Sequence, residues 1–203
     1  MQRQEVIKIL KKDLNFSDES IIKLQKFSDL VLRENKKYNL IAKSTEKTIW
    51  TRHILDSAQL VKFIDFNAKS LADLGSGAGL PGIVIDIFNK NKGFHVKLYE
   101  KSPVKRAFLE KVKAELNLTS QVLGNVNDEN LDAEIIICRA FKKLDKVIQV
   151  SREIAKKPHK LIVLKGQNAQ EDLNKTFKTK KYSYRLEESM TEKDSKIILM
   201  QIN

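Results

Sequence analysis

The spacing of apolar residues changes near residue 66. Before that point apolar positions recur every three or four residues, the period of a helix with one buried face. This period predicts helices over residues 5–14, from Asp18 through Val31, and over residues 46–64. Beyond it, short apolar runs alternate with helical stretches, which predicts parallel strands joined by crossover helices. We therefore expect a helical N-terminal cap at residues 1–65 and an α/β domain at residues 66–203.

The α/β segment contains seven candidate strands and four candidate helices. No helical stretch separates the last two strands, which predicts an antiparallel hairpin at the edge of the sheet. Within the cap, Arg52 and Asp56 are four residues apart on one predicted helix, so they can pair across one turn. The predicted strands are 70–74, 95–100, 119–123, 133–138, 161–165, 182–187 and 196–201, and the predicted helices are 81–89, 103–116, 144–156 and 169–177.

A glycine-rich loop follows the first of these strands. Glycine adopts positive φ and lets the backbone approach a ligand closely. Pro81 suits the first turn of the helix that follows. Strand, loop and helix in this order predict a nucleotide-like ligand at the carboxyl end of the first strand. The glycines are Gly75, Gly77, Gly79 and Gly82.

Two acidic residues narrow the ligand class. The glycines follow the spacing G-x-G-x-G rather than the G-x-G-x-x-G of dinucleotide enzymes, and Asp73 stands two residues before the first of them. A carboxylate there suits the ammonium and sulfonium of S-adenosylmethionine better than a pyrophosphate. Glu100 closes the next strand, where a carboxylate can accept both ribose hydroxyls. A purely structural glycine turn and an NAD-type oxidoreductase are the alternatives.

Composition excludes several other classes of protein. The hydrophobic content of 41% is enough for a core. The sequence shows neither a run of about 20 apolar residues nor the apolar core of a signal peptide, so we expect a cytoplasmic protein without a membrane partner. Cys138 is the single cysteine, and the three histidines are far apart, so we expect neither a disulfide nor a metal.

The charge alone leaves nucleic-acid binding open. A net charge of +12 attracts a polyanion at long range. However, the chain has 31 lysines against 7 arginines, as expected of a compositional drift toward lysine. The surplus is also spread along the chain, with +4 in residues 1–65 and +8 in residues 66–203.

Five short strings between residues 36 and 170 make the chain resemble one family. In order, they are Tyr38-Asn39-Leu40, the string R-H-I-L-D-S at residues 52–57, D-L-G-S-G-A-G-L-P-G at residues 73–82, Arg139-Ala140-Phe141 and Leu164-Lys165-Gly166. Together they resemble the RsmG/GidB family of bacterial 16S rRNA guanine-N7 methyltransferases. The resemblance implies a Rossmann-like class I S-adenosylmethionine-dependent methyltransferase fold with an N-terminal helical extension. It also implies action on the 530 loop, in 16S rRNA or the small ribosomal subunit. We expect the protein to be a monomer.

The resemblance also implies roles for individual residues. Glu100 would bind the ribose of the cofactor and Asp73 its methionyl end. Relatives tend to carry Arg and Glu around residues 125–127, so a side-chain contact to adenine would be lost here, whereas a backbone contact would not. The other implied cofactor-binding residues are Gly75, Gly77, Gly79, Leu80, Val126, Asn127 and Arg139, and the candidates for positioning RNA or guanine are Asn39, Arg52, His53, Arg106 and Lys165.

Several of these roles have alternatives that the residues leave open. Arg139 and Lys165, at strand ends, can bind the cofactor carboxylate or an RNA phosphate, or can form surface ion pairs. His53 can be packed or functional, and Asn39 can bond a guanine edge or cap a turn. Arg106 can simply be solvated.

The expected chemistry needs no general base. Guanine N7 carries an in-plane lone pair, so catalysis reduces to aligning N7 with the methyl carbon and sulfur. In agreement, the sequence shows no convincing nucleophile or acid/base dyad. Cytosine-C5 methyltransferases instead use a cysteine near the fourth strand, where Cys138 stands, but Cys138 reads as part of a buried strand. A non-catalytic RNA-binding module with this fold is a further alternative.

Overall fold

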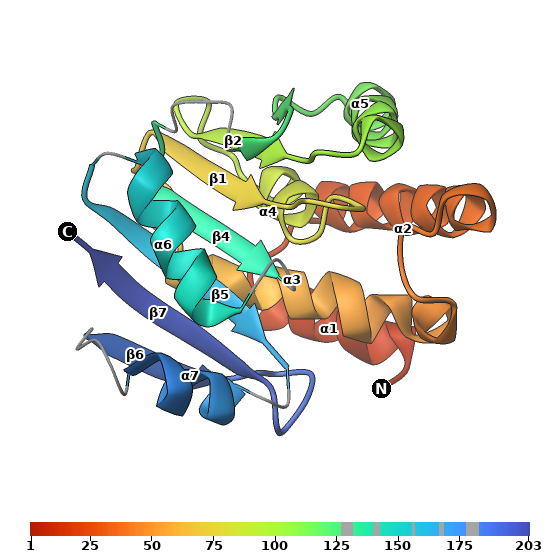
Figure 1. The fold of residues 1–203 in the computed structure, drawn as a ribbon. Helices are drawn as coiled ribbons and strands as arrows, with labels where there is room; N and C mark the ends of the chain where they lie inside the picture. The colour runs from red at the N-terminus through yellow and green to blue at the C-terminus, as the bar shows by residue number, and fades with distance from the viewer. Residues whose placement is uncertain (127–131, 140–142, 156, 167–168, 178–182) are drawn as a thin grey trace.

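The strands form a single seven-stranded sheet in the order β3-β2-β1-β4-β5-β7-β6 (Figure 1). A computed structural model describes residues 1–126, 132–139, 143–155, 157–166, 169–177 and 183–203. Each predicted strand is present, with ends that differ from the prediction by no more than about two residues. The strands are β1 (Ser70–Leu74), β2 (His95–Tyr99), β3 (Gln121–Leu123), β4 (Ile135–Arg139), β5 (His159–Lys165), β6 (Tyr184–Glu188) and β7 (Lys196–Ile202).

The sheet is parallel except at one strand. Strands β1 to β5 pair in parallel, with Asp73 opposite Leu98 of β2 and Ile137 of β4, whereas β7 runs antiparallel to both of its neighbours. This confirms the predicted hairpin, in which β6 is the edge strand and β7 lies inside the sheet. The strand order reverses between β1 and β4, so the carboxyl ends of these two strands flank the crevice where open α/β sheets bind ligands.

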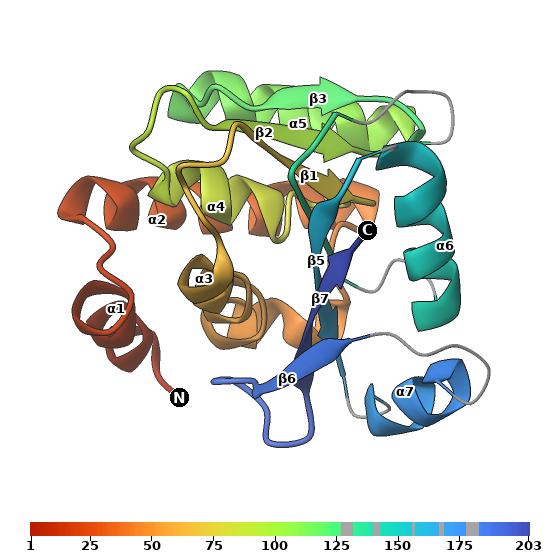
Figure 2. The same cartoon turned by 90° about the vertical axis from the view of Figure 1, so that its left-hand side faces the viewer.

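Helices cover both faces of the sheet (Figure 2). The core on one face joins α4 (Gly82–Phe88) and α5 (Pro103–Leu116) to apolar residues of the N-terminal helices. The core on the other face joins α6 (Leu144–Ala155) and α7 (Ala169–Phe177) to the alternate residues of the same strands. The four helices predicted after residue 66 are therefore confirmed. Within the described part of the chain, no helix is both long and apolar enough to cross a membrane.

The N-terminal helices belong to the first of these cores. Helix α1 (Arg3–Lys12) precedes α2 (Asp18–Tyr38), which begins where Ser17 Oγ accepts a hydrogen bond from Ser20 N at 3.1 Å. Side chains of α2 such as Leu24 and Phe27 share one continuous apolar cluster with Ile137 of β4. Residues 1–65 thus form a layer against the sheet, and their separation as a distinct cap domain stays a prediction.

The predicted single helix over residues 46–64 is wrong in detail. The segment divides into a 3-10 helix, η1 (Lys43–Thr48), a π-helix, η2 (Trp50–Leu55), the short α3 (Asp56–Ala58) and a second 3-10 helix, η3 (Gln59–Phe63). In a π-helix each carbonyl bonds the N–H five residues on, so four residues span less than one turn. The predicted ion pair between Arg52 and Asp56 is therefore also wrong: each side chain pairs with a distant partner.

Candidate active site

The glycine loop after β1 has the backbone geometry that the sequence predicts. Gly75, Gly77 and Gly79 have φ of 72°, 57° and 88°, in the left-handed region that favours glycine. The loop folds back on β2, because Gly75 N and Ser76 N both donate to the carbonyl of Tyr99, at 2.9 and 3.0 Å. The loop is therefore fixed at the carboxyl ends of β1 and β2.

The glycines of this loop serve two different purposes. A Cβ on Gly79 would lie 2.4 Å from Ile83 Cγ1, and one on Gly82 would lie 2.3 Å from Leu98 Cδ2, so both glycines permit close packing of α4. A Cβ on Gly77 would meet its nearest neighbour, the Gly75 carbonyl, at 3.8 Å. Gly77 therefore faces open space that a ligand can occupy, whereas Gly79 is buried against the protein.

Glu100 is tied to the glycine loop. Its side chain is largely buried, and its two carboxylate oxygens accept hydrogen bonds from Gly77 N at 2.9 Å and from Ser102 N at 2.8 Å. Arg106 of α5 donates to the carbonyls of Glu100 and Lys101, at 2.9 and 2.8 Å. Arg106 thus supports the backbone under Glu100 and is not among the residues that line the cleft described below.

Asp73 is fully buried at the end of β1. One carboxylate oxygen, Oδ2, accepts a hydrogen bond from Gly82 N at 2.9 Å, whereas Oδ1 is buried without a hydrogen-bond partner among the described residues. Burial raises the pKa of Asp73 to about 7, although the Gly82 N–H, the Ser76 hydroxyl and the positive charge of Arg139 all act to lower it. A buried, unpaired acceptor is unfavourable unless a donor or cation reaches it. This site fits the ammonium of a cofactor.

Replacing Asp73 with asparagine should flatten the pH dependence of stability. Because the folded protein keeps the Asp73 proton up to about pH 7 and the unfolded chain loses it near pH 4, unfolding releases a proton in this range. The free energy of unfolding should therefore fall as pH rises from 4 to 7, by up to about 1.4 kcal/mol per pH unit. Urea denaturation of wild type and Asp73→Asn at pH 5 and pH 7 measures this difference, and parallel pH profiles would contradict it.

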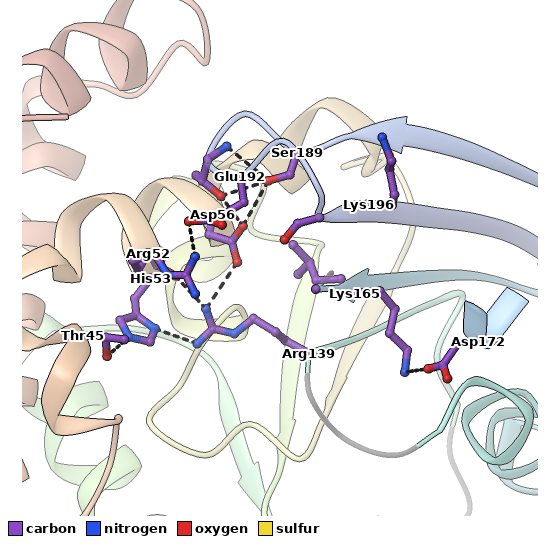
Figure 3. Close-up of a pocket in the computed structure, with 14 residues that line it drawn as sticks. Thr45, Arg52, His53, Asp56, Arg139, Lys165, Asp172, Ser189, Glu192 and Lys196 are labelled. Atoms are coloured by element: carbon purple, nitrogen blue, oxygen red, sulfur yellow. Dashed lines mark hydrogen bonds and ion pairs between the residues drawn. The ribbon is translucent and has the colours of Figure 1, made fainter. Parts of the chain in front are cut away.

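A cleft of about 730 Å³ opens at the carboxyl ends of β4 and β5 (Figure 3). It is bounded by the N-terminal helices on one side and by the turn between β6 and β7 on the other. Among the predicted site residues it gathers Arg52, His53, Arg139 and Lys165, which come from three separate parts of the sequence. The other lining residues are Thr45, Asp56, Leu164, Gly166, Asp172, Ser189, Thr191, Glu192, Ser195 and Lys196.

Arg139 lies at the centre of a hydrogen-bonded chain in this cleft. Its guanidinium contacts His53 Nδ1 at 3.0 Å, the Arg52 carbonyl at 3.3 Å and Asp56 Oδ2 at 3.5 Å (Figure 3). Burial lowers the pKa of Arg139 below that of a free guanidinium, while the carboxylate of Asp56 opposes this shift. The side chain is still 20% exposed, so a ligand in the cleft can reach it.

The other cations of the cleft also have acidic partners. Lys165 Nζ lies 2.6 Å from Asp172 Oδ2, and Arg52 pairs with Glu192 (Figure 3). Of the roles that the sequence allowed for Lys165, the free protein therefore shows the ion pair. The pair is partly exposed, so a phosphate can replace Asp172 as the partner of Lys165.

Four predicted site residues, namely Asn39, Leu80, Val126 and Asn127, lie away from the cleft or outside the described residues. Asn39 ends α2 in a left-handed conformation with φ of 31°, and its exposed side chain is not among the residues that line the cleft. Val126 is buried, and Leu80 is buried within the glycine loop. Asn127 lies outside the described residues, as do Ala140 and Phe141 of the fourth family string.

Sequence reasoning missed several residues of the cleft. Asp56 was assigned to a local pair with Arg52, yet its Oδ1 accepts hydrogen bonds from Gln59 Nε2 at 2.9 Å and Thr191 Oγ1 at 2.8 Å. Glu192 and Thr191 lie in the turn between β6 and β7, more than 130 residues further along the chain. No periodicity or motif marked that turn, so only the fold reveals it.

The strand order, with an antiparallel β7 and a glycine loop after β1, defines the class I methyltransferase fold. A solved structure of an S-adenosylmethionine-dependent methyltransferase from Aquifex aeolicus shares this fold, with a TM-score of 0.60 and 12% identity over 85% of this chain and 98% of that one. A family model described as "GidB: rRNA small subunit methyltransferase G" matches residues 20–199. The chain therefore belongs to this family.

Curated relatives agree over nearly the whole chain. A protein of Pelagibacter ubique named ribosomal RNA small subunit methyltransferase G is 38% identical over 192 residues, covering 92% of this chain and 90% of that one. A protein of the same name from Rickettsia felis is 36% identical over 181 residues, covering 89% and 92%. The family, the fold and S-adenosylmethionine as the cofactor, all expected from the sequence, are thereby confirmed.

Proposed function

We propose that this protein transfers the methyl group of S-adenosylmethionine to N7 of a guanine in the 530 loop of 16S rRNA. The observation that carries the proposal is the meeting of two sites at one sheet edge. The glycine loop, with Glu100 and the unpaired Oδ1 of Asp73, suits the cofactor. The cleft with Arg139 and Lys165 beside it suits an anionic substrate. Membership of an rRNA methyltransferase family supports RNA as that substrate.

Four residues would hold the cofactor. Asp73 would accept from its ammonium, which supplies the cation that the buried carboxylate lacks, and Glu100 would accept from the ribose hydroxyls. The backbone at Gly77 leaves space for the bound molecule, and Arg139 offers donors to a carboxylate. The cofactor supplies an electrophilic methyl group on a sulfonium.

The residues of the cleft suit a reaction that needs alignment rather than proton transfer. Burial and the charges of Arg139 and Arg52 lower the pKa of His53 to about 4, so His53 is neutral at pH 7. Its ring nitrogens are both occupied by protein contacts, which argues against a role as proton carrier. Guanine N7 attacks through its own lone pair, so the protein needs only to place N7 in line with the methyl group.

Methyl transfer to ribosomal particles tests the proposal. Small subunits from cells that lack this protein, incubated with radiolabelled S-adenosylmethionine, should gain one methyl group per particle in the presence of the protein. Because 7-methylguanine can be reduced with borohydride and the RNA then cleaved at that site with aniline, primer extension should then map the modification to the 530 loop. Methylation at another ring atom or another rRNA site would overturn the finer assignment. Cofactor binding without transfer to any RNA form would favour a non-catalytic RNA-binding module.

Cys138 provides a test against the cytosine-C5 alternative. The thiol is buried in β4, and burial together with the negative charge of Asp73 raises its pKa to about 12, so it stays protonated at neutral pH. Cys138→Ala should keep nearly full methyl transfer and lose about 1 kcal/mol of unfolding free energy, as for a small buried truncation. Activity assays and urea denaturation of the same preparation measure both. Loss of transfer in the folded variant would restore the cysteine mechanism.

A further inference from the structure

The contacts of His53 fix which of its nitrogens carries the proton. Arg139 has only donors, so His53 Nδ1, at 3.0 Å from the guanidinium, must accept. In the neutral ring the proton then resides on Nε2, which lies 2.8 Å from Thr45 Oγ1. Thr45 can accept it, because its own hydroxyl donates to the Ala42 carbonyl at 2.7 Å. Each donor in this series of hydrogen bonds, from Arg139 through His53 to Thr45, therefore has an acceptor.

Asp56 holds Arg139 from the opposite side. The Oδ2 atom of Asp56 pairs with the guanidinium, and its Oδ1 is fixed by Gln59 of η3 and by Thr191 of the turn between β6 and β7. His53 and Asp56 come from η2 and α3, so the π-helical turn between them places both side chains toward the end of β4. The guanidinium is thus bracketed by a neutral acceptor and a carboxylate.

The contacts of Arg139 with His53 and Asp56 leave part of the guanidinium available to a ligand. Arginine has five N–H donors. The contacts to His53, Asp56 and the Arg52 carbonyl use no more than three of them among the described residues. The side chain lines the cleft and is partly exposed. The remaining donors suit an oxyanion, which can be the cofactor carboxylate or an RNA phosphate.

We propose that His53 and Asp56 are positioning residues that orient Arg139 toward an oxyanion in the cleft, and that His53 acts as a hydrogen-bond acceptor through Nδ1. This proposal rests on the methyltransferase function proposed above. It gives the histidine of the R-H-I-L-D-S string a role in which the imidazole touches neither cofactor nor base. It also explains why the acid of that string pairs with Arg139 rather than with Arg52.

Two substitutions of His53 separate this role from others. The amide oxygen of asparagine stands two bonds from Cβ, as Nδ1 does, and can accept from Arg139, whereas the polar atoms of glutamine stand three bonds from Cβ, as Nε2 does. His53→Asn should therefore keep kcat/KM within about threefold of wild type, and His53→Gln should lower it tenfold or more. The exposed His95, at the start of β2, supplies the control: His95→Gln should have no effect.

Binding measurements identify the oxyanion and keep the test independent of turnover. Calorimetry gives the dissociation constant of S-adenosylmethionine, and filter binding gives that of 16S rRNA, for wild type and each variant. If Arg139 binds the cofactor carboxylate, His53→Gln and Asp56→Asn should each raise the dissociation constant of S-adenosylmethionine tenfold. If Arg139 binds an RNA phosphate, the same variants should instead raise the dissociation constant of 16S rRNA tenfold. Either result supports the proposal even if the wild-type protein methylates a different RNA site.

Three outcomes would overturn the proposal. Greater loss in His53→Asn than in His53→Gln would place the active nitrogen at Nε2. If His53→Gln changed neither the kinetics nor the two dissociation constants, Arg139 would not depend on His53 for its orientation. Equal loss in both variants, with the unfolding midpoint within a few degrees of wild type, would show that the imidazole itself is required. If neither His53 variant folds, Asp56→Asn alone decides, because positioning predicts weaker oxyanion binding with the other ligand unaffected.

Discussion

Glu100→Ala is expected to weaken binding of S-adenosylmethionine by at least 100-fold. The carboxylate accepts from Gly77 N and Ser102 N, and the proposed ribose contact adds to these. Its removal leaves two amide donors unpaired at a nearly buried site and frees the loop that faces the ligand. Hydrogen bonds to a charged group contribute about 1.5–3 kcal/mol each, so losing those to the ribose is enough for the expected change.

Calorimetric titration with the cofactor measures this effect. Glu100→Gln keeps one acceptor oxygen and should give an intermediate affinity. The matched control is Glu110→Ala, because Glu110 lies ten residues further along the chain, in α5, and forms an exposed pair with Lys113 at 3.0 Å. Glu110→Ala should bind as tightly as wild type. Wild-type affinity in a folded Glu100→Ala protein would show that the cofactor lies elsewhere.

Gly82→Ala is expected to lower the free energy of unfolding by about 3 kcal/mol, from overpacking together with a strained buried hydrogen bond. The new methyl group would lie 2.3 Å from Leu98 Cδ2 and 2.7 Å from Asp73 Oδ2. Leu98 can shift its flexible end, but Asp73 is fixed by its bond to the Gly82 amide itself. Relief of one contact therefore disturbs the other, and the start of α4 is displaced.

Urea denaturation compares this variant with Gly77→Ala. A Cβ on Gly77 meets no atom closer than 3.8 Å, so that variant should lose only about 1 kcal/mol, which is the strain of a side chain at positive φ. The order of the two losses is the result that matters. If Gly77→Ala were the less stable protein, the division of the loop into packing and ligand-facing glycines would be wrong. Gly77→Asp should in addition abolish cofactor binding, because its carboxylate would enter the ligand space.

The strands and the later helices were predictable because their signals are local. Each strand of the sheet is a short apolar run, and α5 begins at Pro103, the residue at which the sequence predicted it to begin. The division of residues 46–64 into several helix types was not predictable. An apolar period of three to four residues fits α-, π- and 3-10 turns almost equally. Packing against α1 and the sheet selects among them, and this choice redirects Arg52 and Asp56.

For the site, the sequence by itself determined the glycine loop after β1 and the charged side chains at strand ends. Gly75 to Gly82, Glu100, Arg139 and Lys165 could be predicted as site residues because glycine spacing and strand ends are local features whose position in a parallel sheet is dictated by topology. Only the tertiary structure decided the partners of these side chains. The turn carrying Thr191 and Glu192 meets Asp56 and Arg52 across more than 130 residues of chain, and Arg139 reaches His53 across 86. Such contacts follow from how layers pack, which no local pattern encodes.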